Sequence, residues 1–136
     1  REAVAGLGKV KTNIDSGVFQ AVQFAGVEAL LRNGRIPEQL SNIYQKRRDQ
    51  VIEGLRSCGL NPFVPRAAFY VWCPVPNGMG SKAFARKLLS EAGVVVTPGV
   101  GFGEQGEGYF RIALTQSEEK LGEALLRIQG VAKELW

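Results

Sequence analysis

Histidine is absent from this sequence of 136 residues, and cysteine is nearly so. Without histidine the chain cannot form a Ser-His-Asp triad, a Cys-His dyad or a histidine-rich metal site. The two cysteines, Cys58 and Cys73, lack the C-x-x-C spacing of metal and redox motifs. We therefore expect no metal site. We expect both thiols to pack as small hydrophobic groups in a reducing compartment, which favours a cytoplasmic location.

Long apolar runs are also missing, and the charge is nearly balanced. No stretch approaches the roughly 18–20 apolar residues that a bilayer-spanning helix needs, so we expect no membrane segment. The net charge is +4, from 17 Lys and Arg against 13 Asp and Glu, and it is spread along the chain. Proteins that bind nucleic acid usually gather basic charge on one face, so we expect no nucleic-acid partner. A hydrophobic content of 45% argues against a wholly disordered chain.

The hydrophobic pattern changes its period along the chain. Spacing near 3.6 predicts helices over residues 1–10, 18–31, 38–57, 81–92 and 117 onward. Short segments such as 68–73, which is rich in aromatic and β-branched residues, are predicted to be strands; the others are 61–64, 94–97 and 109–115. Asp15 or Ser16 is expected to cap the second helix and Ser81 the fourth, while Asn33-Gly34 is a stop signal. The prediction is an α+β fold: a small mixed sheet with helices packed on one face, preceded by a long helix.

Residues 101–106 match the glycine pattern G-x-G-x-x-G of dinucleotide-binding loops. In those loops a helix follows the glycines, and its N-terminus holds the pyrophosphate. Here a strand is predicted next, and the carboxylates of Glu104 and Glu107 would repel phosphate. The pattern instead indicates a long turn between two strands, where glycine tolerates positive φ.

Lys46-Arg47-Arg48 forms a short basic run in the longest predicted helix. The simplest interpretation is a solvated helix face. On a helical wheel, however, Arg47 falls within the apolar stripe of Leu40, Tyr44 and Val51, where it would snorkel to water or pair across an interface. Nothing in this run is specific for nucleic acid.

Arg111 is the most informative charged residue because it lies within a predicted strand. Alternation places it on one face with Tyr109 and Ala113, and Phe110 and Ile112 on the other. Its planar fork is suited to grip a carboxylate through two hydrogen bonds, which indicates a site for an acidic substrate group. The alternative is an arginine on an edge strand, exposed to water or paired with a protein carboxylate.

Several segments resemble one enzyme family. They are Lys11–Gln20, Ala68–Trp72, Val96–Gly99, Gly101–Gly103 and Gly106–Thr115. Together they resemble the C-terminal part of class I/II aminotransferases, the fold-type I enzymes that use pyridoxal 5′-phosphate (PLP). The sequence of Lys11–Gln20 is most similar to that of the branch that contains LL-diaminopimelate aminotransferases and their aspartate-aminotransferase-like relatives.

This resemblance implies roles for three residues. Arg111 would hold the α-carboxylate of the amino acid substrate, and Phe69 would line the same pocket. Asn13 would approach the active site of the neighbouring subunit of a homodimer. The amino group of an amino acid would be transferred to a 2-oxo acid in a cytoplasmic biosynthetic reaction. The resemblance leaves the identity of the amino donor open.

The resemblance also implies a division of the chain and a missing part. Residues 1–35 would end the helical layer of a large domain, 36–58 would form a connecting helix, and 59–136 would form the small C-terminal domain. The family's Schiff-base motif S-K-x-x-x-x-x-G-x-R is not in these residues, and the chain begins at Arg1 rather than Met. We expect a piece of a longer enzyme whose upstream residues bind PLP, with this chain inactive alone. The alternative is a stand-alone α+β ligand-binding or regulatory domain without catalysis.

Overall fold

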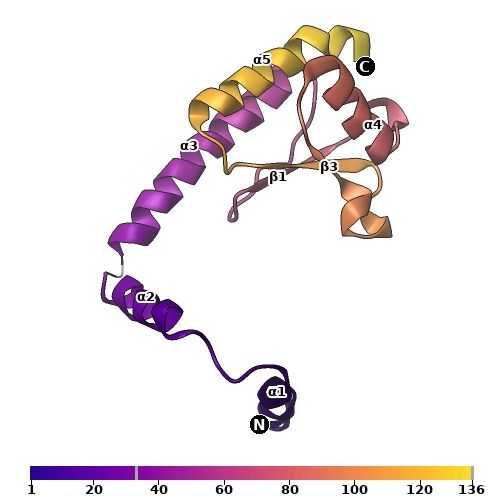
Figure 1. Cartoon of the computed structure of the whole chain (residues 1–136). Helices are drawn as coiled ribbons and strands as arrows, with labels where there is room; N and C mark the ends of the chain where they lie inside the picture. Colours follow the sequence, from indigo (N-terminus) through magenta and orange to yellow (C-terminus); the bar gives the residue numbers. More distant parts are fainter. Residues whose placement is uncertain (33, 136) are drawn as a thin grey trace. The chain divides into compact units, whose positions relative to one another are not determined.

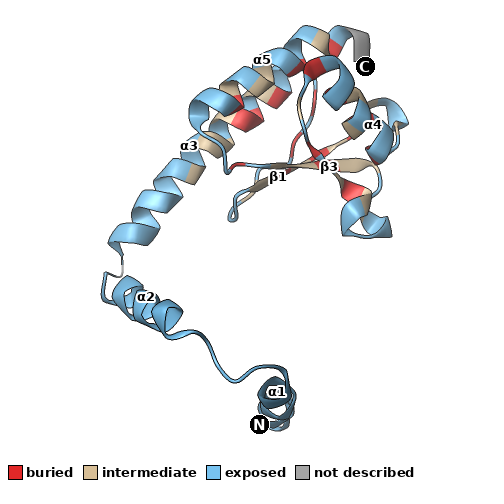
Figure 2. Ribbon diagram, viewed as in Figure 1, coloured by how far each residue is buried: buried red, intermediate tan, exposed pale blue. Residues whose placement is uncertain are grey.

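The computed structural model describes residues 1–32 and 34–135, so Asn33, half of the expected stop signal, lies outside the described residues. The chain forms two compact units, Arg1–Leu40 and Ser41–Trp136. The first holds α1 (Glu2–Ile14), α2 (Gln20–Leu31) and the start of α3 (Arg35–Ser57). Each described residue of this unit is exposed, including the apolar side chains of both short helices (Figure 2).

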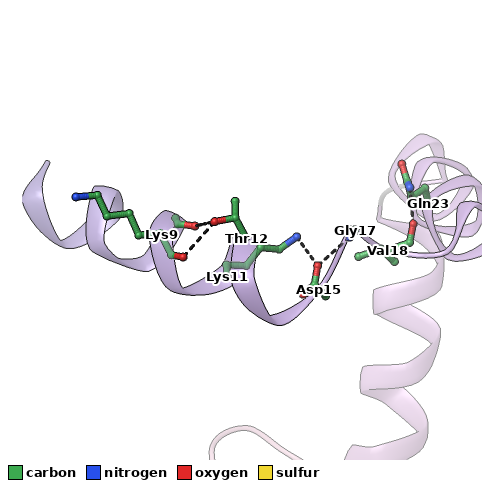
Figure 3. A network of polar contacts seen from close by, with 8 residues as sticks. Lys9, Lys11, Thr12, Asp15, Gly17, Val18 and Gln23 are labelled. Carbon is green, nitrogen blue, oxygen red and sulfur yellow. Dashed lines mark hydrogen bonds and ion pairs between the residues drawn. The ribbon is translucent and has the colours of Figure 1, made fainter.

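The first helix is longer than the sequence predicts, and Asp15 has a different role. The predicted end is residue 10, but α1 continues to Ile14 because glycine weakens a helix without breaking it. Asp15 does not cap α2, which has no side-chain cap. Its carboxylate instead accepts bonds from the Lys11 ammonium at 2.8 Å and the Gly17 amide at 2.9 Å, just after α1 (Figure 3).

The second unit contains a three-stranded sheet in the order β1-β3-β2. The strands are β1 (Tyr70–Pro74), β2 (Thr97–Pro98) and β3 (Tyr109–Ala113). Both pairings are antiparallel, so the expectation of a mixed sheet is wrong on this point although the α+β class is confirmed. The predicted strand at 61–64 is not formed. Pro62 has no amide hydrogen to donate there, and the segment bonds to β1 through the Phe63 amide, to the Trp72 carbonyl, and through the Asn61 backbone, to the Cys73 thiol.

The helices of this unit lie on one face of the sheet, as the sequence predicts (Figure 1). They are the end of α3, the short α4 (Ser81–Lys87) with a π-helical turn over Leu88–Ala92, and α5 (Glu118–Leu135). The expected cap at Ser81 is wrong: Ser81 is the first helical residue, and the preceding Gly80 caps without a side chain. Ser117 does cap α5, through a bond from the Lys120 amide.

The core lies between these helices and one face of the sheet. Its fully buried side chains are Val51 and Leu55 from α3, Val71, Cys73 and Phe110 from the strands, and Phe84, Leu88, Leu114 and Ile128 from the segments around them. Burial raises the pKa of the Cys73 thiol to about 12, so this thiol stays protonated at neutral pH. Within the described residues, no helix has the length and apolar content to cross a membrane.

Candidate functional site

The site is built on the face of the sheet that the helices do not cover. Arg111 lies opposite Trp72 of β1 and opposite Thr97 of β2, so these three residues share that face. Because β3 is the central strand, Arg111 is not on an edge of the sheet. One part of the alternative for this residue, an edge-strand arginine, is therefore wrong.

The Arg111 guanidinium is held between two aromatic rings. Its Cζ atom lies 3.9 Å from the ring centre of Tyr70 and 4.1 Å from that of Phe102. The Phe102 ring also meets the Trp72 ring edge-on, with centres 5.3 Å apart. Such contacts attract a cation through the negative face of the ring, and they also fix the plane of the guanidinium. With both rings in place, a planar anion would have to approach the guanidinium at its edge.

The charge of Arg111 has no carboxylate partner among the described residues. The ion pairs of these residues are Lys11–Asp15, Arg32–Glu28, Arg48–Asp49 and Arg127–Glu123. The Arg111 side chain is half-buried, and its Nε is a buried donor with no hydrogen-bond partner in this part of the chain. Buried donors are normally satisfied, so the site has the chemistry of a receptor for an anionic group.

Phe69 lies beside this aromatic group. Its ring centre is 4.4 Å from that of Tyr70 and 5.6 Å from that of Tyr44 on α3, and the side chain remains partly exposed. The residue before it, Ala68, has a φ of 70°, which is unusual for a residue with a Cβ and turns the chain into β1. The Phe69 ring thus contacts the Tyr70 ring, which in turn contacts the Arg111 guanidinium.

Asn13 belongs to the first unit. It lies in the last turn of α1, is exposed, and its side-chain amide donates to the carbonyl of Lys9 at 2.7 Å. This bond holds the side chain against its own helix.

The basic run on α3 is partly structural. Arg47 is half-buried, and its Nη1 donates to the carbonyl of Leu114 at 3.1 Å, just after β3. Arg48 pairs with Asp49 and reaches the carbonyl of Pro65. Lys46 is exposed. Arg47 and Arg48 therefore make contacts within the α+β unit, and the run is not simply a solvated helix face. This agrees with the position of Arg47 in the apolar stripe of the helix.

The glycine-rich loop leads from β2 into β3, so a strand follows it, as predicted. A helix N-terminus for a dinucleotide is not found at this position. A cavity of about 460 Å³ lies elsewhere, between α5 and residues 93–97. Arg111 contributes to its lining, whereas Tyr70 and Phe102 do not, so this cavity adjoins the aromatic stack at Arg111 without including either ring.

Sequence reasoning missed the residues that surround Arg111. Alternation along β1 could have identified Tyr70 and Trp72 as a pair on one face, opposite Val71 and Cys73. Phe102 was harder to identify from the sequence, because an aromatic residue in a glycine-rich loop does not by itself indicate a contact with Arg111.

Comparison with known proteins identifies the family of the chain. Residues 2–128 match the family model described as "Aminotransferase class I and II". The chain belongs to this family. It is 54% identical over 128 residues to an LL-diaminopimelate aminotransferase of Syntrophobacter fumaroxidans, covering 94% of this chain and 33% of that protein. It is 48% identical over 130 residues to that of Moorella thermoacetica, covering 96% and 33%.

Solved structures of aminotransferases share the fold of the chain. One from Staphylococcus aureus has a TM-score of 0.87 at 33% identity, covering 98% of this chain and 35% of that one. A variant of the Thermus thermophilus aspartate aminotransferase has a TM-score of 0.85 at 31% identity, covering 96% and 36%. The chain thus spans about a third of the length of its aminotransferase relatives. These matches do not support a stand-alone regulatory domain.

Proposed function

We propose that this chain is the C-terminal, substrate-carboxylate-binding region of a PLP-dependent aminotransferase that transfers an amino group from an amino acid to a 2-oxo acid. The observation that carries the proposal is the Arg111 guanidinium, fixed between Tyr70 and Phe102 and without a carboxylate partner in the described residues. A carboxylate in the plane of the fork would receive two charge-assisted hydrogen bonds. Arg111 would thereby orient the substrate.

The other two predicted residues have supporting roles in this proposal. Phe69 lines the pocket, and its ring contacts with Tyr70 and Tyr44 support that role because they hold it beside the stack. Asn13 approaches the active site of the neighbouring subunit of a homodimer. Its exposure on α1 leaves it available for such an approach.

The described residues do not fit PLP, so we propose that upstream residues hold the cofactor. A Schiff-base lysine needs a buried or electropositive setting that lowers its pKa, but every described lysine is exposed except Lys87, which is half-buried on α4. PLP supplies the electron sink of transamination when it is bound. The chain by itself would be inactive.

We propose LL-diaminopimelate as the amino donor to test first, because both curated relatives described above carry that activity in their names. Aspartate and alanine are the comparison donors, each assayed with a 2-oxo acid acceptor. In the same proposal, residues 1–35 end the large domain, 36–58 connect, and 59–136 form the small domain of a cytoplasmic enzyme. The exposed apolar side chains of α1 and α2 support this, since such surface is normally covered.

Substitution of Arg111 in the full-length enzyme tests the proposal. Arg111→Lys keeps the charge but loses the fork, and Arg111→Ala loses both. We expect kcat/KM for the amino donor to fall by about 2–4 kcal/mol of transition-state stabilisation in the alanine variant, roughly 30- to 1000-fold. Arg127→Lys is the matched control, because Arg127 forms an exposed ion pair with Glu123 on α5. Unchanged kcat/KM in Arg111→Ala overturns the proposal.

A further inference from the structure

The loop between β2 and β3 is closed by two glycines. It consists of the 3-10 turns η3 (Gly99–Phe102) and η4 (Glu104–Gly106). A Cβ atom at Gly99 would lie 2.0 Å from the Gly106 carbonyl oxygen, and one at Gly106 would lie 2.1 Å from that of Gly99. Only residues without a Cβ allow the two backbone segments to approach this closely. The two ends of the loop are therefore in direct contact.

Ser81 of α4 ties both ends of this loop to the helix. Its backbone amide and its hydroxyl each donate to a carboxylate oxygen of Glu107, both at 2.7 Å. Its hydroxyl oxygen also accepts a bond from the Val100 amide at 3.5 Å. Ser81 is completely buried, whereas the Glu107 residue that accepts from it is exposed. Bonds to an ionised acceptor are stronger than neutral ones.

Phe102 lies between the two tied ends of the loop. Its ring is 48% exposed, so core packing does not hold it in place. Besides its contacts with Arg111 and Trp72, its position depends on the path of the loop backbone, which the Gly99–Gly106 contact closes and the bonds of Ser81 with Glu107 and Val100 tie to α4. The Glu107 carboxylate, 26 residues away from Ser81 in sequence, thus joins α4 to the loop that carries Phe102.

We propose that Glu107 and Ser81 are positioning residues for Arg111. They hold the loop so that Phe102 covers one face of the guanidinium and leaves its edge for the substrate carboxylate. The substrate part of this inference rests on the proposed function, whereas the control of Phe102 does not. A loosened loop frees the guanidinium to turn out of its plane, so carboxylate binding weakens while the chemistry of the bound substrate is unchanged.

Kinetics of the full-length enzyme test the substrate part. Glu107→Gln and Ser81→Ala are each expected to raise KM for the amino donor about tenfold, with kcat within about twofold of wild type. Phe102→Leu should give the same split. The double variant Phe102→Leu/Glu107→Gln should raise KM no further than either single change, because Glu107 acts through Phe102. Glu104→Gln is the matched control, an exposed carboxylate of the same loop, and should match wild type.

Nuclear magnetic resonance of the 136-residue chain tests the loop without any activity. The Arg111 Nε–Hε signal is shifted by the currents of the two rings that flank it. Glu107→Gln and Ser81→Ala should move this signal toward its position in Phe102→Leu, and Glu104→Gln should leave it in place. An unmoved signal in both variants, wild-type KM in both, or additive effects with Phe102→Leu overturns the inference. If the wild-type full-length enzyme did not catalyse transamination, the proposed function would be wrong, but the inference about the loop would stand.

Discussion

Two arginines of the α+β unit, Arg47 and Arg111, have a buried Nε without a hydrogen-bond partner in the described part of the chain, yet they differ in what they can bind. Arg47 is already engaged, because its Nη1 donates to the Leu114 carbonyl. Among the described residues Arg111 has ring contacts and no carboxylate partner, and contacts of this kind attract a cation by about 0.5–2 kcal/mol. The same residue type is thus structural in one place and a candidate receptor in the other.

Adding one methyl group at Gly106 should destabilise the α+β unit. Its new Cβ would meet the backbone of Gly99, which cannot move aside as a flexible side chain could. We expect Gly106→Ala to lower the free energy of unfolding by about 1–3 kcal/mol, measured by urea denaturation. Gly101→Ala is the control, since a Cβ there has no neighbour within 4 Å. Equal stability of the two variants would contradict this account of the loop.

The Glu107 carboxylate should make stability depend on pH. Its hydrogen bond from the Ser81 amide, then that from the Ser81 hydroxyl, lower the pKa of Glu107 below the usual 4.5. The unfolded chain therefore binds a proton more readily than the folded one. The stabilising contribution is complete above 4.5 and is lost as the pH falls through that value and below it.

Melting temperatures between about pH 3 and pH 6 measure this dependence. Wild type should lose more stability toward acid than Glu107→Gln, which has no carboxyl group to protonate at this position. Glu104→Gln serves as the comparison and should keep the wild-type profile. Parallel acid profiles of wild type and Glu107→Gln would refute the role of this carboxylate.

Among the elements, α5 shows how one helix covers the sheet. Its buried side chains, Leu121, Ile128 and Ala132, recur at helical spacing, while Leu126 points to solvent with 69% of its surface exposed. α3 approaches it closely at Gly54, where a Cβ would lie 2.6 Å from a methyl carbon of Leu125. The two helices thus pack side by side over one end of the core (Figure 1).

Truncation of one buried and one exposed side chain of α5 should show how much of the free energy of unfolding comes from packing and how much from helix propensity. Ile128 is 1% exposed, so Ile128→Ala should cost about 2–5 kcal/mol through lost burial and the remaining cavity. Leu126→Ala, two residues earlier on the exposed face, should change stability by less than about 0.5 kcal/mol. Chemical denaturation of both variants provides the measurement. A similar cost for both would mean that α5 does not pack as described.

At the scale of the whole molecule, the two units differ in how they are stabilised. Residues 41–136 enclose a core of fully buried side chains, whereas none of the described residues of the first unit is buried. Isolated helices of 12 and 13 residues, the lengths of α2 and α1, are marginal in water without tertiary packing. The stability of the first unit therefore depends on packing against surface that its own residues do not provide.

Hydrogen exchange should show this difference directly. In the 136-residue chain, amides of α1 and α2 should exchange orders of magnitude faster than those of β3 and of the buried turns of α5, because little local structure must open to expose them. In the longer enzyme that we propose, the amides of α1 and α2 should become protected. Equal protection of the two units in the isolated chain would contradict this description.

Much of the fold could be predicted from local patterns. Helical spacing identified the five α-helices of the described residues, and alternation assigned Arg111 and Phe110 to opposite faces of their strand. The errors arose where neighbours in space compete with local signals: Asp15 closes α1 instead of opening α2, and Gly80 is the N-cap of α4 while the Ser81 amide donates to Glu107. The roles of Asn13 and Phe69 remain predictions.

The sequence alone determined the helices, the face that carries Arg111 and the resemblance to aminotransferases, because these depend on spacing and on residue types within short segments. Only the tertiary structure decided that β3 is the central strand, that Tyr70 and Phe102 enclose the guanidinium, and that Glu107 bonds to Ser81. The physical reason is that such contacts join residues far apart along the chain, so they depend on strand register and loop closure, which local periodicity does not encode.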